Sequence, residues 1–326
     1  MQLMHNPPTR YRDAASRASA RRSARKQDLQ ALPYLLPWIL GISIFFLYPL
    51  VATVYFSFTR YDQINPPTFV GLKNWIYVFT QYGPFFQGLG NTFVLILLIV
   101  PASTVFGIIT ALVVINIRRG AGILRTLFYL PFLAPPVAAT LAFVFLLSAN
   151  GAVNQFLGFF GLDGPSWFTD PATAKIALTI LGLWGIGNLM VIFLAALLDV
   201  PREQYEAASL DGAGALGRFW YVTLPAIRPI ILFSVITGII QTLQYYTQAV
   251  VAGRIASGQS IGPGALAVLG YPNGSTLTLP QLIYTLGFQN FDTGSASVVS
   301  VVLIVLALIF TSFLLRRGSV FLADGE

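Results

Sequence analysis

Six stretches of this chain are apolar over a length that can cross a lipid bilayer, and they limit the possible folds more than any other feature. About 20 apolar residues in a helix span the hydrocarbon core, where backbone polar groups must be satisfied within the segment. The predicted fold is therefore all-α, a polytopic membrane protein with six transmembrane helices. We place the spans near residues 32–58, 90–116, 123–148, 174–198, 229–252 and 296–315.

The composition agrees with this class and excludes several functions. Of the 326 residues, 56% are hydrophobic and 10% are charged, whereas soluble domains carry about 25% charged residues. The chain has no Cys, and its single His, His5, lies near the N-terminus. The chain therefore cannot form disulfides or thiolate metal sites, and its apolar body has no His for a metal cluster. A membrane enzyme would have few candidate catalytic residues.

The basic residues indicate the orientation in the membrane. Of the 19 Lys and Arg residues, fifteen flank the spans on one side and four on the other, and seven of the fifteen lie in residues 1–30. Because basic residues collect on the cytoplasmic side, both termini are predicted to be cytoplasmic, in a multi-pass protein of the cell membrane. This distribution accounts for the net charge of +7 without nucleic-acid binding. We predict a basic cytoplasmic tail at 1–30 and a transmembrane domain at 31–320.

The third span is expected to be interrupted. It contains Pro131, Pro135 and Pro136, and each proline removes a backbone donor from the helix. A kinked or broken helix must pack against neighbouring helices rather than bare lipid.

A charged insert, residues 199–228, separates the fourth and fifth spans and is predicted to be cytoplasmic. Pro201 suits the first turn of a helix, and Glu203 and Glu206 place negative charge near its N-terminus. Gly212 is a helix stop, and a second amphipathic piece follows over residues 215–221 and ends at residues 224–225. The pattern predicts two short helices, and the aromatic residues of the second one need an apolar surface to pack on.

One motif in the insert is misleading. Gly212-Ala-Gly214-Ala-Leu-Gly217 matches the dinucleotide fingerprint, but no strand precedes it and no acidic residue follows about 20 positions later. No phosphate-binding loop of the form G-x-x-x-x-G-K-[ST] occurs in the chain. We therefore expect no ATP hydrolysis by this chain.

The insert resembles a known motif. Glu206-Ala-Ala-Ser-Leu-Asp211-Gly212-Ala213, followed by Val222-Thr-Leu-Pro225, is similar to the EAA loop of ABC importer permeases, although Val222 stands where Ile is usual. Pro33-Tyr-Leu-Leu-Pro37 and Phe69-Val-Gly-Leu-Lys-Asn74 resemble the first, maltose-type permease of carbohydrate-uptake systems, and the resemblance extends over the chain after the N-terminal tail.

The resemblance implies a function and a set of partners. It identifies the charged insert as the coupling loop, which docks on an ATP-hydrolysing subunit, with Glu206, Ala207, Ala208, Asp211 and Gly212 as the coupling residues. The implied partners are a second homologous permease, a dimer of ATP-binding subunits that holds ATP and Mg, and an extracytoplasmic solute-binding protein. The implied mechanism is alternating access, with no cofactor bound by this chain.

Polar residues inside the spans are candidate substrate contacts, because burying them unpaired costs free energy. Residues 241, 244, 245 and 248 follow the spacing of one helical face in the fifth span. Amides and hydroxyls bind sugar hydroxyls, aromatic rings stack on sugar rings, and polar contacts between helices are the alternative role. The candidate substrate residues are Trp184, Asn188, Gly238, Gln241, Thr242, Gln244 and Tyr245.

Other transport classes remain as alternatives. One alternative is a permease of the same family for glycerol phosphate or another polyol. An anionic substrate such as glycerol phosphate would be expected to recruit a basic residue, and the deep spans have none. A stand-alone secondary transporter would be expected to place a carboxylate or a cation-coupling group in the membrane, and the spans offer neither. Membrane lipid and a neutral sugar are the expected small-molecule partners.

Overall fold

The computed structural model describes residues 34–117, 119–258 and 270–323, and the chain divides into two compact units, Met1–Tyr55 and Phe56–Glu326. In the first unit the described residues belong to one helix, Tyr34–Phe56, which includes the π-helical stretch η1 (Ser43–Leu47) and α2 (Tyr48–Phe56). None of the described residues of this unit is buried. An apolar helix of this length is stable when lipid or a partner chain covers it. The predicted basic tail lies outside the described residues.

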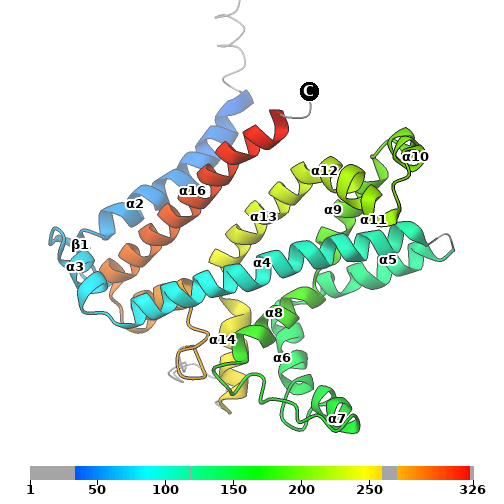
Figure 1. Ribbon diagram of the computed structural model, residues 1–326. Coiled ribbons are helices and arrows are strands. Elements are labelled where there is room, and N and C mark those ends of the chain that lie inside the picture. The colour runs from blue at the N-terminus through cyan, green and yellow to red at the C-terminus, as the bar shows by residue number, and fades with distance from the viewer. Residues whose placement is uncertain (1–33, 118, 259–269, 324–326) are drawn as a thin grey trace, which may run out of the picture. The chain divides into compact units, whose positions relative to one another are not determined.

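Helix α4 (Pro84–Asn116) organises the packing of the second unit (Figure 1). Its 33 residues make it about 50 Å long, which exceeds the thickness of the hydrocarbon core and requires tilting or protrusion. The helix contributes buried side chains to four apolar clusters, from Phe85 near one end to Val114 near the other. Several other helices of this unit therefore pack against α4 at different points along its length.

Three membrane-length segments are bent pairs of helices. They bend by 99° between Leu133 and Pro136, by 55° between Trp184 and Gly187, and by 66° between Ala226 and Arg228. The first bend confirms the interruption expected from the prolines. The described residues contain three unbroken helices that are long and apolar enough to cross a membrane, or up to six such segments if each bent pair is one span. The elements of the first two pairs are α5 (Ala121–Tyr129), η2 (Leu130–Leu133), α6 (Pro136–Leu146), α8 (Ala174–Trp184) and α9 (Gly187–Leu198).

The predicted continuous helix over residues 229–252 is wrong. Helix α13 (Arg228–Leu243) ends at Leu243, and α14 (Thr247–Ala256) begins four residues later. A turn of the chain frees backbone groups that need new partners, and the Thr278 hydroxyl donates to the Tyr245 carbonyl at 2.9 Å. A side chain from a distant loop thus stabilises the break.

The end of the unit opposite the charged insert is held by side-chain contacts to backbone. Strand β1 (Thr59–Arg60) pairs antiparallel with β2 (Thr68–Phe69), with Thr59 opposite Phe69. The Asn74 side chain donates to the Thr59 carbonyl at 2.8 Å, and the Gln63 side chain donates to the Gly287 carbonyl at 2.9 Å. The hairpin is therefore fixed on its neighbours. The remaining elements of the second unit are α3 (Lys73–Thr80), α7 (Ala152–Phe159), α15 (Leu279–Tyr284), η4 (Thr285–Gln289) and α16 (Thr293–Ala323).

Candidate functional site: the coupling loop and the interrupted helices

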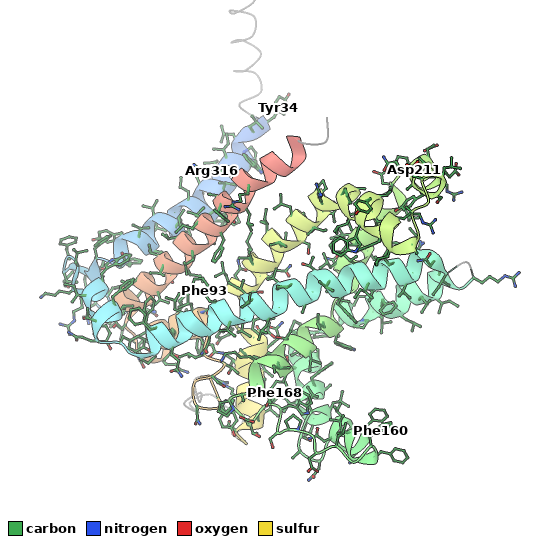
Figure 2. All side chains as sticks on the ribbon, viewed as in Figure 1. Tyr34, Phe93, Phe160, Phe168, Asp211 and Arg316 are labelled. Carbon is green, nitrogen blue, oxygen red and sulfur yellow. The ribbon has the colours of Figure 1, made fainter. Side chains whose placement is uncertain are left out.

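The charged insert folds as two helical pieces, as predicted. The first is α10 (Arg202–Leu210), preceded by Pro201. The second continues from residue 215 through residue 226, beyond its predicted end, because Pro225 lies at the start of a helical turn, where its missing N–H is not needed. Its parts are α11 (Ala215–Arg218), η3 (Phe219–Thr223) and α12 (Leu224–Ala226). Figure 2 places Asp211 of the insert and Phe160 on opposite sides of α4 in this view.

Gly212 closes the first helix as predicted. Its φ is +83°, the left-handed region in which glycine has no steric penalty. The Ala213 N–H donates to the Ala208 carbonyl at 2.9 Å, and the Gly212 N–H donates to the Ser209 carbonyl at 3.1 Å. These two bonds form a Schellman motif and satisfy carbonyls that the helix end leaves free.

Side chains join the two helices of the insert. The Tyr205 and Thr223 hydroxyls are hydrogen-bonded at 3.0 Å, and an Arg218 Nη atom donates to the Ser209 hydroxyl at 3.3 Å. A hollow of about 430 Å³ lies between the helices, lined by Tyr205, Glu206, Ser209, Leu210 and Arg218. The insert is therefore a braced two-helix element.

The outer surface of the insert combines apolar and acidic groups. Of the five predicted coupling residues, Ala208 is half-buried and the other four are exposed. Leu210 is 90% exposed and Tyr221 is 81% exposed. Phe219 packs against the buried cluster around Phe193, whereas Trp220 remains exposed. Exposed large apolar side chains next to carboxylates are a surface that a protein partner can cover.

Two interruptions of the spans leave polar groups exposed. At the bend between α8 and α9, Trp184 and Asn188 are both exposed, and the Trp184 ring lies 5.5 Å from the Phe143 ring. At the end of α13, Gln241 and Gln244 are exposed. Because lipid cannot hydrogen-bond to these amides, they require a partner chain, water or a polar solute.

The other three candidate substrate residues pack within the protein. Thr242 is buried, and its hydroxyl donates to the Gly238 carbonyl at 2.8 Å. A side chain at Gly238 would lie 3.3 Å from Val100 of α4. The Tyr245 hydroxyl donates to the Leu178 carbonyl at 3.4 Å. The four residues expected on one helical face do not share a helix, because α13 ends at Leu243, and Gln241 and Gln244 are exposed whereas Tyr245 is half-buried.

Two contacts that hold the interrupted helices in place are not evident from the sequence. The Thr104 and Ser234 hydroxyls form a buried hydrogen bond of 2.9 Å between α4 and α13. Gly187 lies against the backbone of Phe128 and Tyr129, where any Cβ atom would collide. Small and hydroxyl-bearing residues at helix contacts are typical of membrane proteins, but the sequence does not show which helices they join.

The described part of the chain thus combines membrane-length helices with a braced two-helix insert between two of them. Residues 103–319 match the family described as the binding-protein-dependent transport system inner membrane component. The chain belongs to this family, so it is a multi-pass inner-membrane permease subunit of a binding-protein-dependent ABC importer, and it is not the ATPase. Family membership excludes the stand-alone secondary transporter.

Relatives and solved structures agree with this assignment. The chain is 33% identical to the probable ABC transporter permease protein YesP of Bacillus subtilis, over 91% of this chain and 93% of YesP. It is also 33% identical to the lactose transport system permease protein LacF of Rhizobium radiobacter, over 92% of this chain and 99% of LacF. A crystal structure of a bacterial ABC transporter that imports the acidic polysaccharide alginate superposes with a TM-score of 0.74 at 23% identity, covering 90% of this chain and 96% of that one. This last similarity supports the fold.

The described residues contain no group of three or more His, Cys, Asp or Glu residues that could hold a metal ion.

Proposed function

We propose that this permease moves a sugar or oligosaccharide into the cytoplasm by alternating access. The observation that carries the proposal is the exposure of Asn188, Gln241 and Gln244 at interruptions of membrane-length helices. Amide groups at these positions can donate and accept the hydrogen bonds that water otherwise makes to the hydroxyls of a passing sugar. The similarity to a lactose permease supports a saccharide as the substrate.

The coupling loop is the proposed receiver of mechanical work. ATP binding closes a dimer of ATP-binding subunits, and their movement shifts α10 and, through the Tyr205–Thr223 hydrogen bond, the segment that leads into α13. Glu206, Ala207, Ala208, Asp211 and Gly212 are the proposed contact residues. ATP and Mg are held by those subunits. This mechanism places the insert and both termini in the cytoplasm.

The exposed helix faces imply further partners. A second homologous permease would cover part of the apolar surface and complete the pathway, and an extracytoplasmic solute-binding protein would deliver the solute to the opposite end. The proposed substrate contacts are Trp184 and Asn188, at the bend between α8 and α9, and Gln241 and Gln244, at the end of α13. Gly238, Thr242 and Tyr245 are proposed to support these contacts by packing, as their hydrogen bonds and neighbours indicate.

The test is a double substitution, Gln241→Leu with Gln244→Leu, in the complex purified with its ATPase and reconstituted in liposomes. Each lost hydrogen bond contributes about 0.5–1.5 kcal/mol. The concentration of loaded solute-binding protein that gives half-maximal ATP-dependent uptake should therefore rise at least about tenfold. Gln155→Leu is the control, because Gln155 is exposed on α7 and bonds only to its own segment, at the Asn150 carbonyl.

Unchanged uptake in the double variant, with the complex assembled, would remove these glutamines from the site. A tagged chain that never copurifies with an ATP-binding subunit would contradict the coupling assignment. Transport of glycerol phosphate with no saccharide uptake would establish the polyol alternative.

A further inference from the structure

The segment between α6 and α8 carries an uncovered patch of phenylalanine rings. Phe156, Phe159 and Phe160 lie on α7 and directly after it, and they are 66%, 87% and 63% exposed. The Phe156 and Phe160 ring centroids are 5.2 Å apart, and those of Phe159 and Phe160 are 5.8 Å apart, both with edge-to-face geometry. In Figure 2, Phe160 lies at the tip of the segment that projects away from α4. These three residues are called the phenylalanine patch below.

Helix α7 separates this patch from its packed side. The three patch residues have the i, i+3, i+4 spacing of one helical face. On the other side, Val153 packs against the buried cluster that contains Phe168, and Asn154 is itself buried. One face of α7 is therefore fixed to the protein, and the other is open.

Asn154 makes the segment a firm support for the patch. Its side-chain amide donates to the Pro165 carbonyl at 3.0 Å and to the Ala149 carbonyl at 3.3 Å. Its Oδ1 atom accepts a hydrogen bond of 2.8 Å from the Trp167 indole N–H. Phe168, the next residue, is 5% exposed and belongs to a cluster with residues of α6 and α8. The patch is thus held outward and does not fold back into the core.

The surroundings of the patch favour lipid as its cover. No charged residue occurs between Arg125 and Asp163, so this surface offers no ion pairs to a protein partner. On α6, Val137, Leu141 and Phe145 are exposed and follow one another at intervals of four residues, which places them on one side of the helix. Helix α6 ends at residue 146 and α7 begins at residue 152. The patch therefore lies close in sequence to an exposed apolar face of a membrane-length segment.

A protein partner fits the patch less well than lipid does. Interfaces that form and dissociate are about as apolar as the rest of a protein surface, and a solute-binding protein that leaves would return three rings to water. Contacts between membrane helices are rich in small residues, whereas helices that lie in the membrane surface carry large apolar side chains such as Phe on one face. The exposed Asp163 side chain follows the patch and requires water, so it limits the depth of the segment.

We propose that α7 is an interfacial helix whose phenylalanine patch inserts into the lipid leaflet on the side of the membrane opposite the coupling loop. Helix α7 precedes the pair α8–α9 and the coupling loop follows it, so the two lie on opposite sides when this pair is one span. The rings reach the boundary of headgroups and acyl chains, about 5–10 Å into the membrane. Because Asn154 ties α7 to both ends of its loop, the anchor holds the adjoining ends of α6 and α8 at the bilayer surface.

The anchor depends on the membrane assignment and not on the proposed substrate, so a failure of saccharide uptake would leave it standing. The chain has no Cys, and a single introduced Cys therefore carries one nitroxide label. The complete transporter, with Cys-free partner subunits, is placed in nanodiscs of phosphatidylcholine. Electron paramagnetic resonance then measures how often the label collides with oxygen, which is enriched in lipid, and with a water-soluble nickel chelate.

A label at Phe160→Cys should collide more with oxygen than with the nickel chelate. Gln155→Cys is the matched control, because Gln155 is exposed on the same helix and stands about 140° around it from position 160. The label at the control position should collide more with the nickel chelate. A nickel excess at position 160 would place the patch in water and overturn the proposal.

A second variant tests whether the rings hold the segment in lipid. Phe156→Ser with Phe159→Ser should remove the oxygen excess at position 160, because burial of large apolar side chains drives the insertion. Asn154 and Trp167 are unchanged in this variant, so the support of the loop is retained. The same oxygen excess with and without these two rings would show that the patch is not the anchor.

Protein partners are the competing cover, and the same labels identify them. A label at position 160 that neither reagent reaches would lie under protein and would overturn the lipid assignment. Collisions that return when the solute-binding protein is left out would identify that protein as the cover. Collisions that stay absent without it would identify the second permease.

Discussion

Gly212 offers the sharpest test of the coupling loop, through the substitution Gly212→Ala. The glycine has φ +83°, and no atom lies within 4 Å of the position that a Cβ would occupy. The substitution therefore adds backbone strain without a steric clash. Placing an L-residue with a side chain in the left-handed region costs roughly 1–2 kcal/mol, which corresponds to a factor of about 5–30 in a conformational equilibrium.

That cost acts on the turn between α10 and α11. Either the Schellman bonds from Gly212 and Ala213 remain and the turn is strained, or they open and the orientation of the loop changes. We expect Gly212→Ala to lower ATP-driven uptake about fivefold or more, with ATP hydrolysis less affected than uptake. Gly212→Asn should be milder, since Asn tolerates this region better, and Gly212→Pro should abolish uptake because it also removes the N–H that bonds to Ser209.

The assay is uptake and ATP hydrolysis measured on the same proteoliposomes, after the amount of assembled complex is matched. Gly214→Ala is the control, because Gly214 has φ −68° and equal free space for a Cβ. If Gly212→Ala and Gly214→Ala gave the same uptake, the argument that turn geometry transmits the movement would be refuted.

Three further predictions follow from contacts in the second unit. Gly187→Val should destabilise the purified protein by about 1–3 kcal/mol, because the new side chain meets backbone that cannot move aside. Thermal melting measures the loss of stability, and Gly185→Ala is the control because Gly185 has space for a Cβ. Thr278→Val should cost about 1–3 kcal/mol by leaving the carbonyl at the α13–α14 break unpaired, and Thr278→Ser should restore the melting temperature. Hydrogen bonds from the Asn65 backbone, the Asn65 side chain and the Ile64 backbone lower the pKa of Asp62 from 3.8 to about 2. Since the pKa of Asp62 is lower in the folded state, its carboxylate stabilises the turn above pH 3.8, and this stabilisation is lost as the pH falls toward 2. Amide protection factors in the turn, which correct for the intrinsic pH dependence of exchange, should therefore fall more on acidification than they do in Asp62→Asn.

The sequence determined the class of protein through features that are local in the chain. The length of the apolar segments predicts membrane helices, because a helix forms its backbone hydrogen bonds within itself. The prolines at 131, 135 and 136 predict a bend, because each lacks the N–H that a helix interior needs. Gly212 predicts the turn of the coupling loop because only a residue without a Cβ adopts its φ freely. These inferences need no knowledge of neighbouring helices, and the structure agrees with them.

The tertiary structure alone decided which polar residues are open and which are packed. Helical spacing placed Gln241, Gln244 and Tyr245 on one face, but the helix ends at Leu243. The Thr278 hydroxyl, 33 residues beyond Tyr245, bonds to the Tyr245 carbonyl and holds the turn. Such contacts join groups that sequence periodicity cannot relate, because the partner that satisfies a broken helix can come from any segment that packs beside it.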